Sequence, residues 1–140
     1  MKGHTVFLTL FILLGFFGCK SHKPVTTVLK YVKLGEGGGF TGAWEYWSVN
    51  QNGKVFYIGT EGKSVEKQSV DIKAIKQIFA EVDAFFKSQK EVVNRPGNMS
   101  RTLNFVDGAS ERQATWAVED PQYVQLDSMY ISWLSRIKGK

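Results

Sequence analysis

The segment "AWEYWSVNQNGKVFYIGT", residues 43–60, determines the fold that the sequence predicts. Two runs rich in aromatic and β-branched residues flank the dipeptide Asn52-Gly53. This dipeptide is the strongest short-range signal for a β-hairpin, because both central positions of its tight turn require a positive φ. The segment therefore predicts two antiparallel strands joined by a two-residue loop.

Such a loop also fixes which side chains share a face of the sheet, because side chains alternate between faces with a period of two residues. The more apolar set is expected to face the core, and it consists of Trp47, Val49, Phe56 and Ile58. The other set is expected on the opposite face, and it consists of Trp44, Tyr46, Ser48 and Tyr57. Three large aromatic side chains on an uncovered face would form a patch suited to binding a partner.

The hydrophobic period changes after this hairpin. Between Val70 and Lys87, apolar residues recur at spacings of three and four, which predicts an amphipathic helix with Ser69 as its N-cap. Asp120-Pro121 predicts the start of a second helix, because Asp caps helices and Pro suits the first helical position. Its apolar stripe consists of Tyr123, Leu126, Tyr130, Trp133, Leu134 and Ile137.

The remaining strands complete an α+β fold. Residues 26–34 are predicted to form a strand, residues 35–42 a glycine-rich loop, and the runs on either side of Asp107-Gly108 a second hairpin. The predicted order is β-β-β-α-β-β-α within a single domain, residues 25–140. We expect an antiparallel sheet with both helices packed on one face.

The glycine-rich loop has two interpretations. Residues 37–42 match the G-x-G-x-x-G pattern, but a strand follows instead of the helix that a dinucleotide site requires, so this site is excluded. The segment is either a wide turn with Phe40 tucked against the sheet edge, or a loop in which Gly38, Gly39 and Phe40 contact a partner.

Composition limits the chemistry that the domain can perform. The chain has 140 residues and a net charge of +5 at pH 7. Its basic residues are scattered rather than clustered, so we expect no nucleic-acid partner. The only Cys, Cys19, and both His, His4 and His22, precede the predicted domain. The domain therefore lacks Ser–His–Asp and Cys–His catalysis, the usual zinc ligands and disulfides, and we expect no metal, no cofactor and no enzymatic activity.

The N-terminal segment has the form of an export signal. The run from Val6 to Phe17 is almost wholly apolar, and as a helix it would span roughly 18 Å, well short of the ~30 Å hydrocarbon core of a bilayer. A short basic start precedes this run and the small residue Gly18 follows it, so residues 1–18 are predicted to be a signal peptide. Two interpretations leave Cys19 unmodified: it follows an ordinary signal peptide, or it is buried in an N-terminal core segment.

The tetrad Phe16-Phe17-Gly18-Cys19 resembles the lipobox of bacterial lipoproteins, with Phe in place of the usual residues at its first two positions. The resemblance implies cleavage before Cys19, a diacylglyceryl thioether on its sulfur and palmitate-type acylation, which together anchor a protein stably in a membrane. Residues 19–24 would form a tether. Because Lys20 rather than Asp follows the Cys, the resemblance points to the outer membrane of a Gram-negative bacterium.

A second resemblance concerns the domain. "GGGFTG", residues 37–42, leads into a strand, and the predicted order of elements is similar to that of the emfourin family of small proteinaceous metallopeptidase inhibitors. Residues 52–57 also resemble a hairpin of uncharacterised lipoprotein domains. The signal peptide and the pair Trp44 and Trp47 depart from the inhibitor family. The resemblance implies a non-enzymatic domain that binds another protein.

Two functions follow as expectations. The first is a membrane-anchored lipoprotein with a non-enzymatic module that binds an unknown protein partner, and the residues expected to bind are Gly38, Gly39, Phe40, Trp44, Tyr46 and Tyr57. The alternative is a small carbohydrate- or cell-wall-active enzyme that uses two carboxylates among Glu36, Glu45 and Glu61. A deep cleft that gathers two of these carboxylates would favour the enzyme, whereas a flat aromatic sheet face would favour the binding module.

The lipid anchor is testable at one residue. Because Cys19 is the only Cys, Cys19→Ser removes the only sulfur that can carry the thioether lipid. We expect the variant to lose membrane association or to accumulate as an unprocessed precursor. Detergent partitioning and mass spectrometry of the N-terminus measure both outcomes. A mature wild-type chain with a free Cys19 thiol would contradict the prediction.

Overall fold

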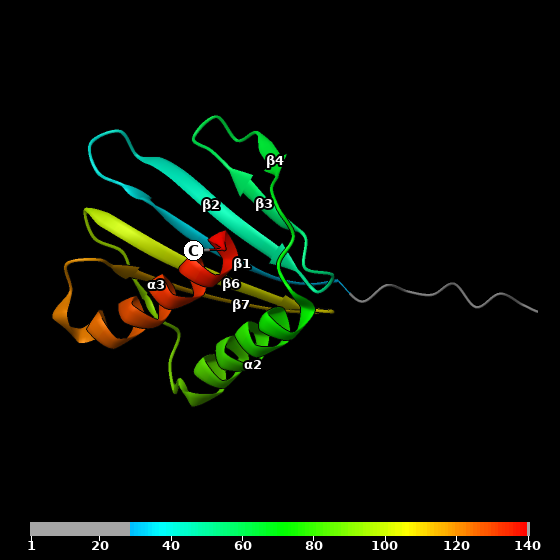
Figure 1. Cartoon of the computed structure of the whole chain (residues 1–140). Coiled ribbons are helices and arrows are strands. Elements are labelled where there is room, and N and C mark those ends of the chain that lie inside the picture. Colours follow the sequence, from blue (N-terminus) through cyan, green and yellow to red (C-terminus); the bar gives the residue numbers. More distant parts are fainter. Residues whose placement is uncertain (1–28, 140) are drawn as a thin grey trace, which may run out of the picture.

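Seven strands form one sheet in the computed structural model, which describes residues 29–139 (Figure 1). Their bounds are β1 Lys30–Gly38, β2 Ala43–Asn50, β3 Val55–Ile58, β4 Ser64–Glu66, β5 Asn94–Arg95, β6 Met99–Asp107 and β7 Ser110–Ala117. The strand order across the sheet is β4-β3-β2-β1-β6-β7-β5. All neighbours are antiparallel except β5 and β7, so the sheet is mixed rather than wholly antiparallel.

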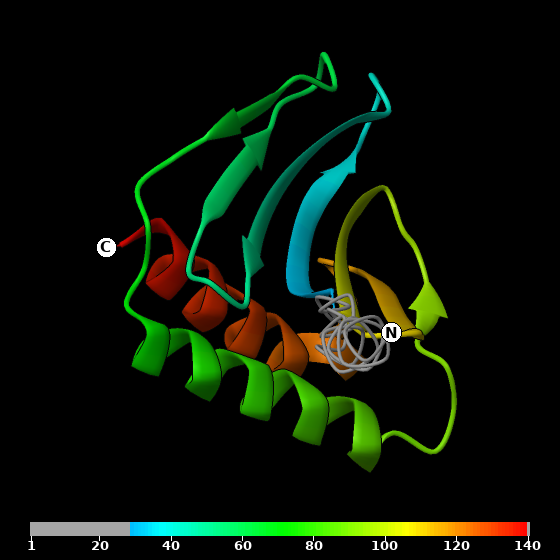
Figure 2. The same cartoon turned by 90° about the vertical axis from the view of Figure 1, so that its right-hand side faces the viewer.

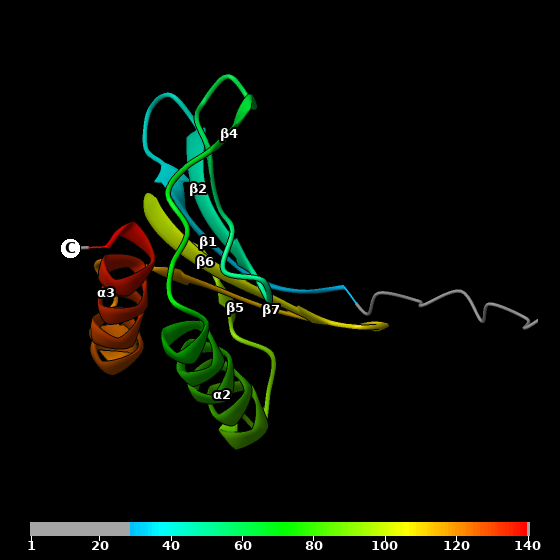
Figure 3. The same cartoon turned by 45° about the vertical axis from the view of Figure 1, so that its right-hand side comes forward.

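Both helices lie on the same side of the sheet, which confirms the predicted α+β class (Figure 3). They are α2, Ile72–Ser88, and α3, Val124–Lys138, which follows a short 3-10 turn, η1, Pro121–Tyr123. We call the covered side the helix face, to which Val32 and Leu34 of β1 contribute, and the other side the open face, to which Gly35 and Gly37 contribute. No helix within residues 29–139 is long and apolar enough to cross a membrane.

The helix starts agree in part with the prediction. Asp120 caps η1 by accepting a hydrogen bond from the Gln122 N–H at 2.9 Å, with Pro121 at the first position as expected. The predicted cap of the first helix, Ser69, is wrong. Asp71 performs this role, because its carboxylate accepts hydrogen bonds from the backbone N–H groups of residues 73 and 74, at 2.8 Å and 3.2 Å.

The loop between β2 and β3 is one residue longer than predicted. The Asn50 N–H donates to the Lys54 carbonyl at 3.1 Å, which leaves Gln51, Asn52 and Gly53 between them. Gly53 has a φ of +81° and donates its N–H to the Asn50 carbonyl, as in a type I turn followed by a glycine bulge. The Asn50 side chain strengthens this arrangement by accepting from the N–H groups of Asn52 and Lys54.

This extra residue reverses the faces of β3, because a one-residue shift in pairing turns every side chain of a strand over. The observed pairs are Val49 with Val55, Trp47 with Tyr57, Ser48 with Phe56 and Tyr46 with Ile58. Trp47 and Val49 face the helices as predicted. The predicted positions of the β3 side chains are wrong: Phe56 and Ile58 lie on the open face, and Tyr57 lies on the helix face.

Strand β1 continues through half of the predicted glycine loop. Only residues 39–42 form the turn. Gly35 and Gly37 remain in the strand because aromatic side chains of β2 occupy the space above them: a Cβ at Gly35 would stand 2.5 Å from ring atoms of Tyr46, and one at Gly37 would stand 2.5 Å from the indole of Trp44. These rings replace the missing side chains and compensate for the weak strand propensity of glycine.

The core fills the space between the helix face and the two helices. Its largest fully buried side chains are Trp116, Trp133, Tyr130, Phe105, Leu34, Ile75, Ile78, Leu103 and Ile137. Truncating side chains of this kind to Ala typically costs about 2–5 kcal/mol. Packing of this cluster is the main reason that both helices hold their positions on the sheet.

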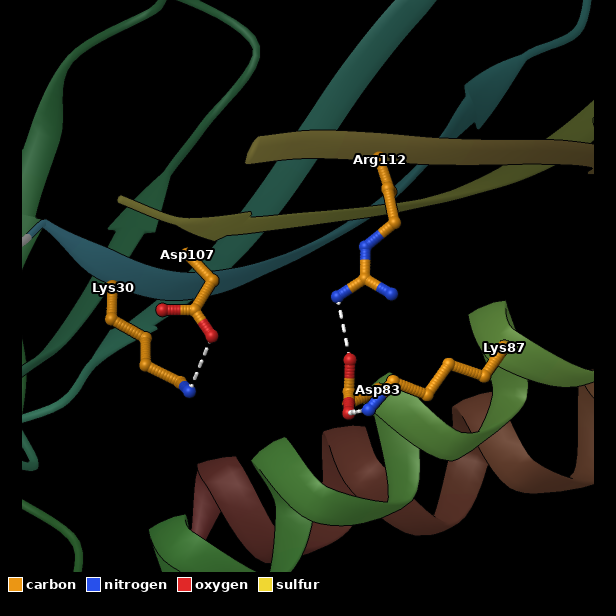
Figure 4. A network of polar contacts seen from close by, with 5 residues as sticks. All are labelled: Lys30, Asp83, Lys87, Asp107 and Arg112. Atoms are coloured by element: carbon orange, nitrogen blue, oxygen red, sulfur yellow. Dashed lines mark hydrogen bonds and ion pairs between the residues drawn. The ribbon is translucent and has the colours of Figure 1, made fainter. Parts of the chain in front are cut away.

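Polar side chains connect the helices to each other and to the sheet. Glu81 of α2 accepts a hydrogen bond from the Trp133 indole of α3 at 2.8 Å and is ion-paired with Arg136. Figure 4 shows a second connection, in which Arg112 of β7 and Lys87 each lie 2.7 Å from the Asp83 carboxylate. Lys30 and Asp107 form a further ion pair between β1 and β6, also at 2.7 Å.

The contact between Gly35 and Tyr46 leads to a prediction about stability. Gly35→Ala places a methyl group within the space of the Tyr46 ring, and overpacking of this kind costs about 1–3 kcal/mol. In a Tyr46→Ala background the added loss should be smaller, because the ring is gone, while the Thr102 Cγ2, at 2.7 Å, still crowds the added methyl group. Urea unfolding of the wild type, both single variants and the double variant measures this coupling. Equal losses in both backgrounds would contradict it.

The Glu81 contacts lead to a prediction about pH. Partial burial disfavours ionisation of Glu81, but the hydrogen bonds from Arg136, Trp133 and Gln77 outweigh it and lower its pKa. A lowered folded-state pKa adds stability above the unfolded value of about 4.3. This stability is lost as the pH falls through the folded value.

We therefore expect Glu81→Gln to reduce the free energy of unfolding at pH 7 by about 1 kcal/mol. The variant should also lose less stability than the wild type below about pH 4.3. Urea unfolding between neutral and acidic pH tests both statements. Glu91→Gln, at an exposed Glu, is the matched control. Parallel pH profiles for wild type and Glu81→Gln would refute the assignment.

Candidate functional site

The turn between β1 and β2 presents an aromatic side chain to solvent. Figure 2 shows this turn projecting at the end of the sheet away from α2. Gly39 and Gly42, with φ of +66° and +64°, allow the chain to reverse, and Phe40 between them is completely exposed, at 108%. The expectation that Phe40 tucks against the sheet edge is therefore wrong. The base of the turn is fixed, because the Gly39 N–H donates to the Asn98 carbonyl at 2.5 Å.

A cleft of about 470 Å³ lies beside this turn on the helix face, and we call it the turn cleft. Its walls come from β1, the turn, β2 and α3. The side chains that bear on its chemistry are Glu36, Phe40, Glu45, Trp47, Tyr130 and Lys138. Two of the three carboxylates expected from the sequence, Glu36 and Glu45, thus lie at one site.

A network of polar side chains holds Glu36 in place. Its carboxylate lies 2.9 Å from the Arg101 Nε of β6, and the same guanidinium is ion-paired with Asp127 of α3. Arg101 also lies over the Tyr130 ring, 4.9 Å from its centroid. Asp127 in turn accepts a hydrogen bond from the Trp116 indole at 3.2 Å. This network fixes the position of Glu36.

Glu45 stands directly opposite Glu36 in the pairing of β1 with β2 and is exposed. Within residues 29–139, no cationic side chain forms an ion pair with Glu45. Desolvation and the neighbouring Glu45 carboxylate together raise the pKa of Tyr57 on the adjacent strand. Glu61 does not join the site, because it lies in an exposed segment after β3 and is ion-paired with Lys63.

The open face carries a second group of aromatic side chains. The rings of Trp44 and Tyr46 are nearly parallel, at 13°, with centroids 5.9 Å apart. The Lys33 ammonium lies 4.2 Å from the Tyr46 ring centroid. Because the rings pack on Gly35 and Gly37, both remain half-buried although no helix covers them.

The six residues expected to bind a partner are therefore divided. Gly38, Gly39 and Phe40 lie at the turn and line the turn cleft. Trp44 and Tyr46 lie on the open face, whereas Tyr57 lies on the helix face. Cys19 and the predicted tether lie outside the described residues.

Three of the six side chains named above, Trp47, Tyr130 and Lys138, have no role in the sequence-based prediction of the site, and Trp47 was expected only to face the core. Tyr130 belongs to the predicted apolar stripe of the last helix, so its periodicity indicates only a core position. Lys138 lies in the last turn of α3, where a basic residue is common because it complements the helix dipole. The signal that could have drawn attention to Tyr130 is its hydroxyl group, since a buried tyrosine usually needs a hydrogen-bond partner.

Known proteins provide no further guidance to this site. Family models and curated proteins give no match to the chain. The resemblances to bacterial lipoproteins and to the emfourin family therefore remain predictions. Within residues 29–139, no three side chains of His, Cys, Asp and Glu gather closely enough to hold a metal ion.

Proposed function

We propose that the domain is a non-enzymatic protein-binding module, carried by a membrane-anchored lipoprotein, and that it engages its partner with the turn between β1 and β2. The observation that carries this proposal is the complete exposure of Phe40. Burial of a phenylalanine side chain is worth about 1.5–3 kcal/mol, so an aromatic ring that is fully exposed in the free protein is available to bind a partner.

The surroundings of Phe40 support this role. The glycine turn leaves the ring clear of its own chain, while the bond from Gly39 to Asn98 holds the base of the turn in place. Aromatic anchors presented on a fixed scaffold bind with a smaller loss of conformational entropy than those on a free loop. Inhibition of a peptidase, which the emfourin resemblance implies, would use the same projecting turn.

The position of Leu29 fits a lipid anchor before the domain. The Leu29 carbonyl accepts a hydrogen bond from Gly108, at the end of β1 opposite the glycine turn. Strand β1 has nine residues, which at roughly 3.3 Å each separate the two ends by about 30 Å. An anchor that precedes Leu29 would therefore leave Phe40 at the end of the domain far from the attachment point.

A second candidate function has one observation in its favour, the presence of Glu36 and Glu45 in the turn cleft. Glycoside hydrolysis needs one carboxyl group that is protonated and one that is ionised. Glu36 already forms an ion pair with Arg101, and Glu45 is exposed to water, so neither carboxyl group has the apolar enclosure that a general acid needs. The arrangement therefore supports protein binding better than hydrolysis.

Phe40→Ala tests the proposed function. We expect the variant to keep the wild-type melting temperature, because Phe40 has no role in the core. Its capture of partner from detergent-solubilised membranes should fall by at least about tenfold, as for an aromatic anchor at an interface. Quantitative mass spectrometry of proteins captured by wild type and variant provides the measurement. Val92→Ala, at another exposed apolar residue, is the matched control.

Two results would refute the protein-binding proposal. One is a set of captured proteins that is identical for wild type and Phe40→Ala. The other is release of sugars from cell-wall polysaccharide by the purified protein, provided that Glu45→Gln abolishes the release, because this would establish the enzyme.

A further inference from the structure

We propose that the turn cleft receives a basic side chain, arginine or lysine, from an extended segment of the protein partner. This inference rests on the proposed function, because it specifies the chemistry of the partner at the same site. It depends on the charge of the cleft, on the hydroxyl group of the buried Tyr130 and on the contact that Lys138 already makes there.

The first observation is an acidic cleft in a basic protein. The chain as a whole has a net charge of +5, whereas the ionised side chains that line the cleft are Glu36, Glu45 and Lys138. Arg101 does not reverse this balance, because it is shared between Glu36 and Asp127. Glu45 has no ion-pair partner among residues 29–139, and only the Tyr57 hydroxyl group approaches its carboxylate closely, so its charge can still be paired with a cation from outside.

The second observation is the hydroxyl group of Tyr130. The side chain of Tyr130 is 99% buried, and its remaining exposure faces the turn cleft. No hydrogen bond to this hydroxyl is present within the described residues, although a buried tyrosine usually has a partner. Burial, and then the nearby Glu36 carboxylate, raise its pKa, so the group stays neutral and its oxygen can accept a hydrogen bond from a cation.

The third observation is that an ammonium group already lies against the wall of the cleft. The Lys138 Nζ is 5.0 Å from the centroid of the Trp47 ring, which is a cation–π contact. Within residues 29–139, Lys138 forms no ion pair with a carboxylate. The chain's own lysine thus shows that this wall accepts a cation, and Lys138 would compete with an incoming basic side chain.

The apolar rim of the cleft indicates what surrounds the basic side chain. Phe40 is wholly exposed and Met99 is 37% exposed, and both border the cleft. A partner segment with an apolar residue next to its arginine or lysine would bury these side chains while placing the charge inside.

Matched peptides test the inference with the full chain in detergent. The probe is a fluorescein-labelled nonapeptide with a central arginine flanked by leucine and otherwise glycine and serine. Its control contains citrulline, which has nearly the same shape without the charge. We expect the arginine peptide to bind at least about tenfold more tightly by fluorescence anisotropy, as befits hydrogen bonds to charged groups. Equal binding, or no binding of the arginine peptide at millimolar concentration, would overturn the inference.

Variants of the cleft should change the affinity for the arginine peptide in opposite directions. Glu45→Gln should weaken binding of the arginine peptide by about three- to tenfold, and Tyr130→Phe should weaken it without lowering the melting temperature. Lys138→Gln should strengthen it about threefold, because the competing cation is removed. Glu61→Gln is the control for a carboxylate outside the cleft and should leave binding unchanged. A Glu45→Gln effect no larger than that of Glu61→Gln would overturn the inference.

The inference and the proposed function can fail separately. If Phe40→Ala loses partner capture while the arginine and citrulline peptides bind equally, the protein-binding module stands and the basic side chain is wrong. If the peptides differ as expected but capture does not depend on Phe40, the cleft recognises a cation and the proposed role of the turn is wrong.

Discussion

The packing of Trp44 and Tyr46 on the glycines of β1 is the constraint on which the rest of the domain depends. Strand β1 is central, because it pairs along its length with both β2 and β6. Its open face has no side chains at Gly35 and Gly37, so two aromatic rings from β2 cover that part of the sheet themselves. Both helices are then free to pack on the other face, where Val32 and Leu34 are fully buried. Extending β1 through the glycines also carries the turn to the end of the sheet.

The predictions that succeeded depend on hydrophobic periodicity, because apolar residues recur at the positions whose side chains are buried. The spacing of apolar residues in 70–87 and after Asp120 identified both helices, because one stripe of each must face the core. The register of β3 failed for a different reason. Asn52-Gly53 suits a two-residue loop and also a three-residue loop with Gly53 in the bulge, since both need one glycine with positive φ. The Asn50 side chain stabilises the second form through two hydrogen bonds, and this local competition left Tyr57 on the face opposite to the one predicted.

The site was predictable only within one short segment of the sequence, residues 36–45, which holds Glu36, Phe40 and Glu45. Gly38 ends β1, and Gly39 and Phe40 begin the turn that follows directly, so the composition of this one segment drew attention to it. The turn cleft also needs Arg101 from β6 and Tyr130 from α3, which are distant in the sequence and meet only because β6 pairs with β1 and α3 crosses the helix face. No local sequence pattern predicts that residues from such distant elements come into contact. Periodicity places Tyr130 in the core, which is correct, but it cannot show that the hydroxyl of this residue lines a cleft.

The proposed binding mode would combine two kinds of recognition that differ in their physical origin. An exposed aromatic ring such as Phe40 would contribute affinity through burial of apolar area, and this contribution is insensitive to which apolar partner is present. The carboxylates of Glu36 and Glu45 would contribute selectivity, because a partner without a cation would leave desolvated charges uncompensated. Glu36 cannot move away from such a partner, since Arg101 and Asp127 hold it, and the base of the turn is held by Asn98. Because Glu36 and the base of the turn are held before binding, the proposed binding mode would lose little conformational entropy at these two points.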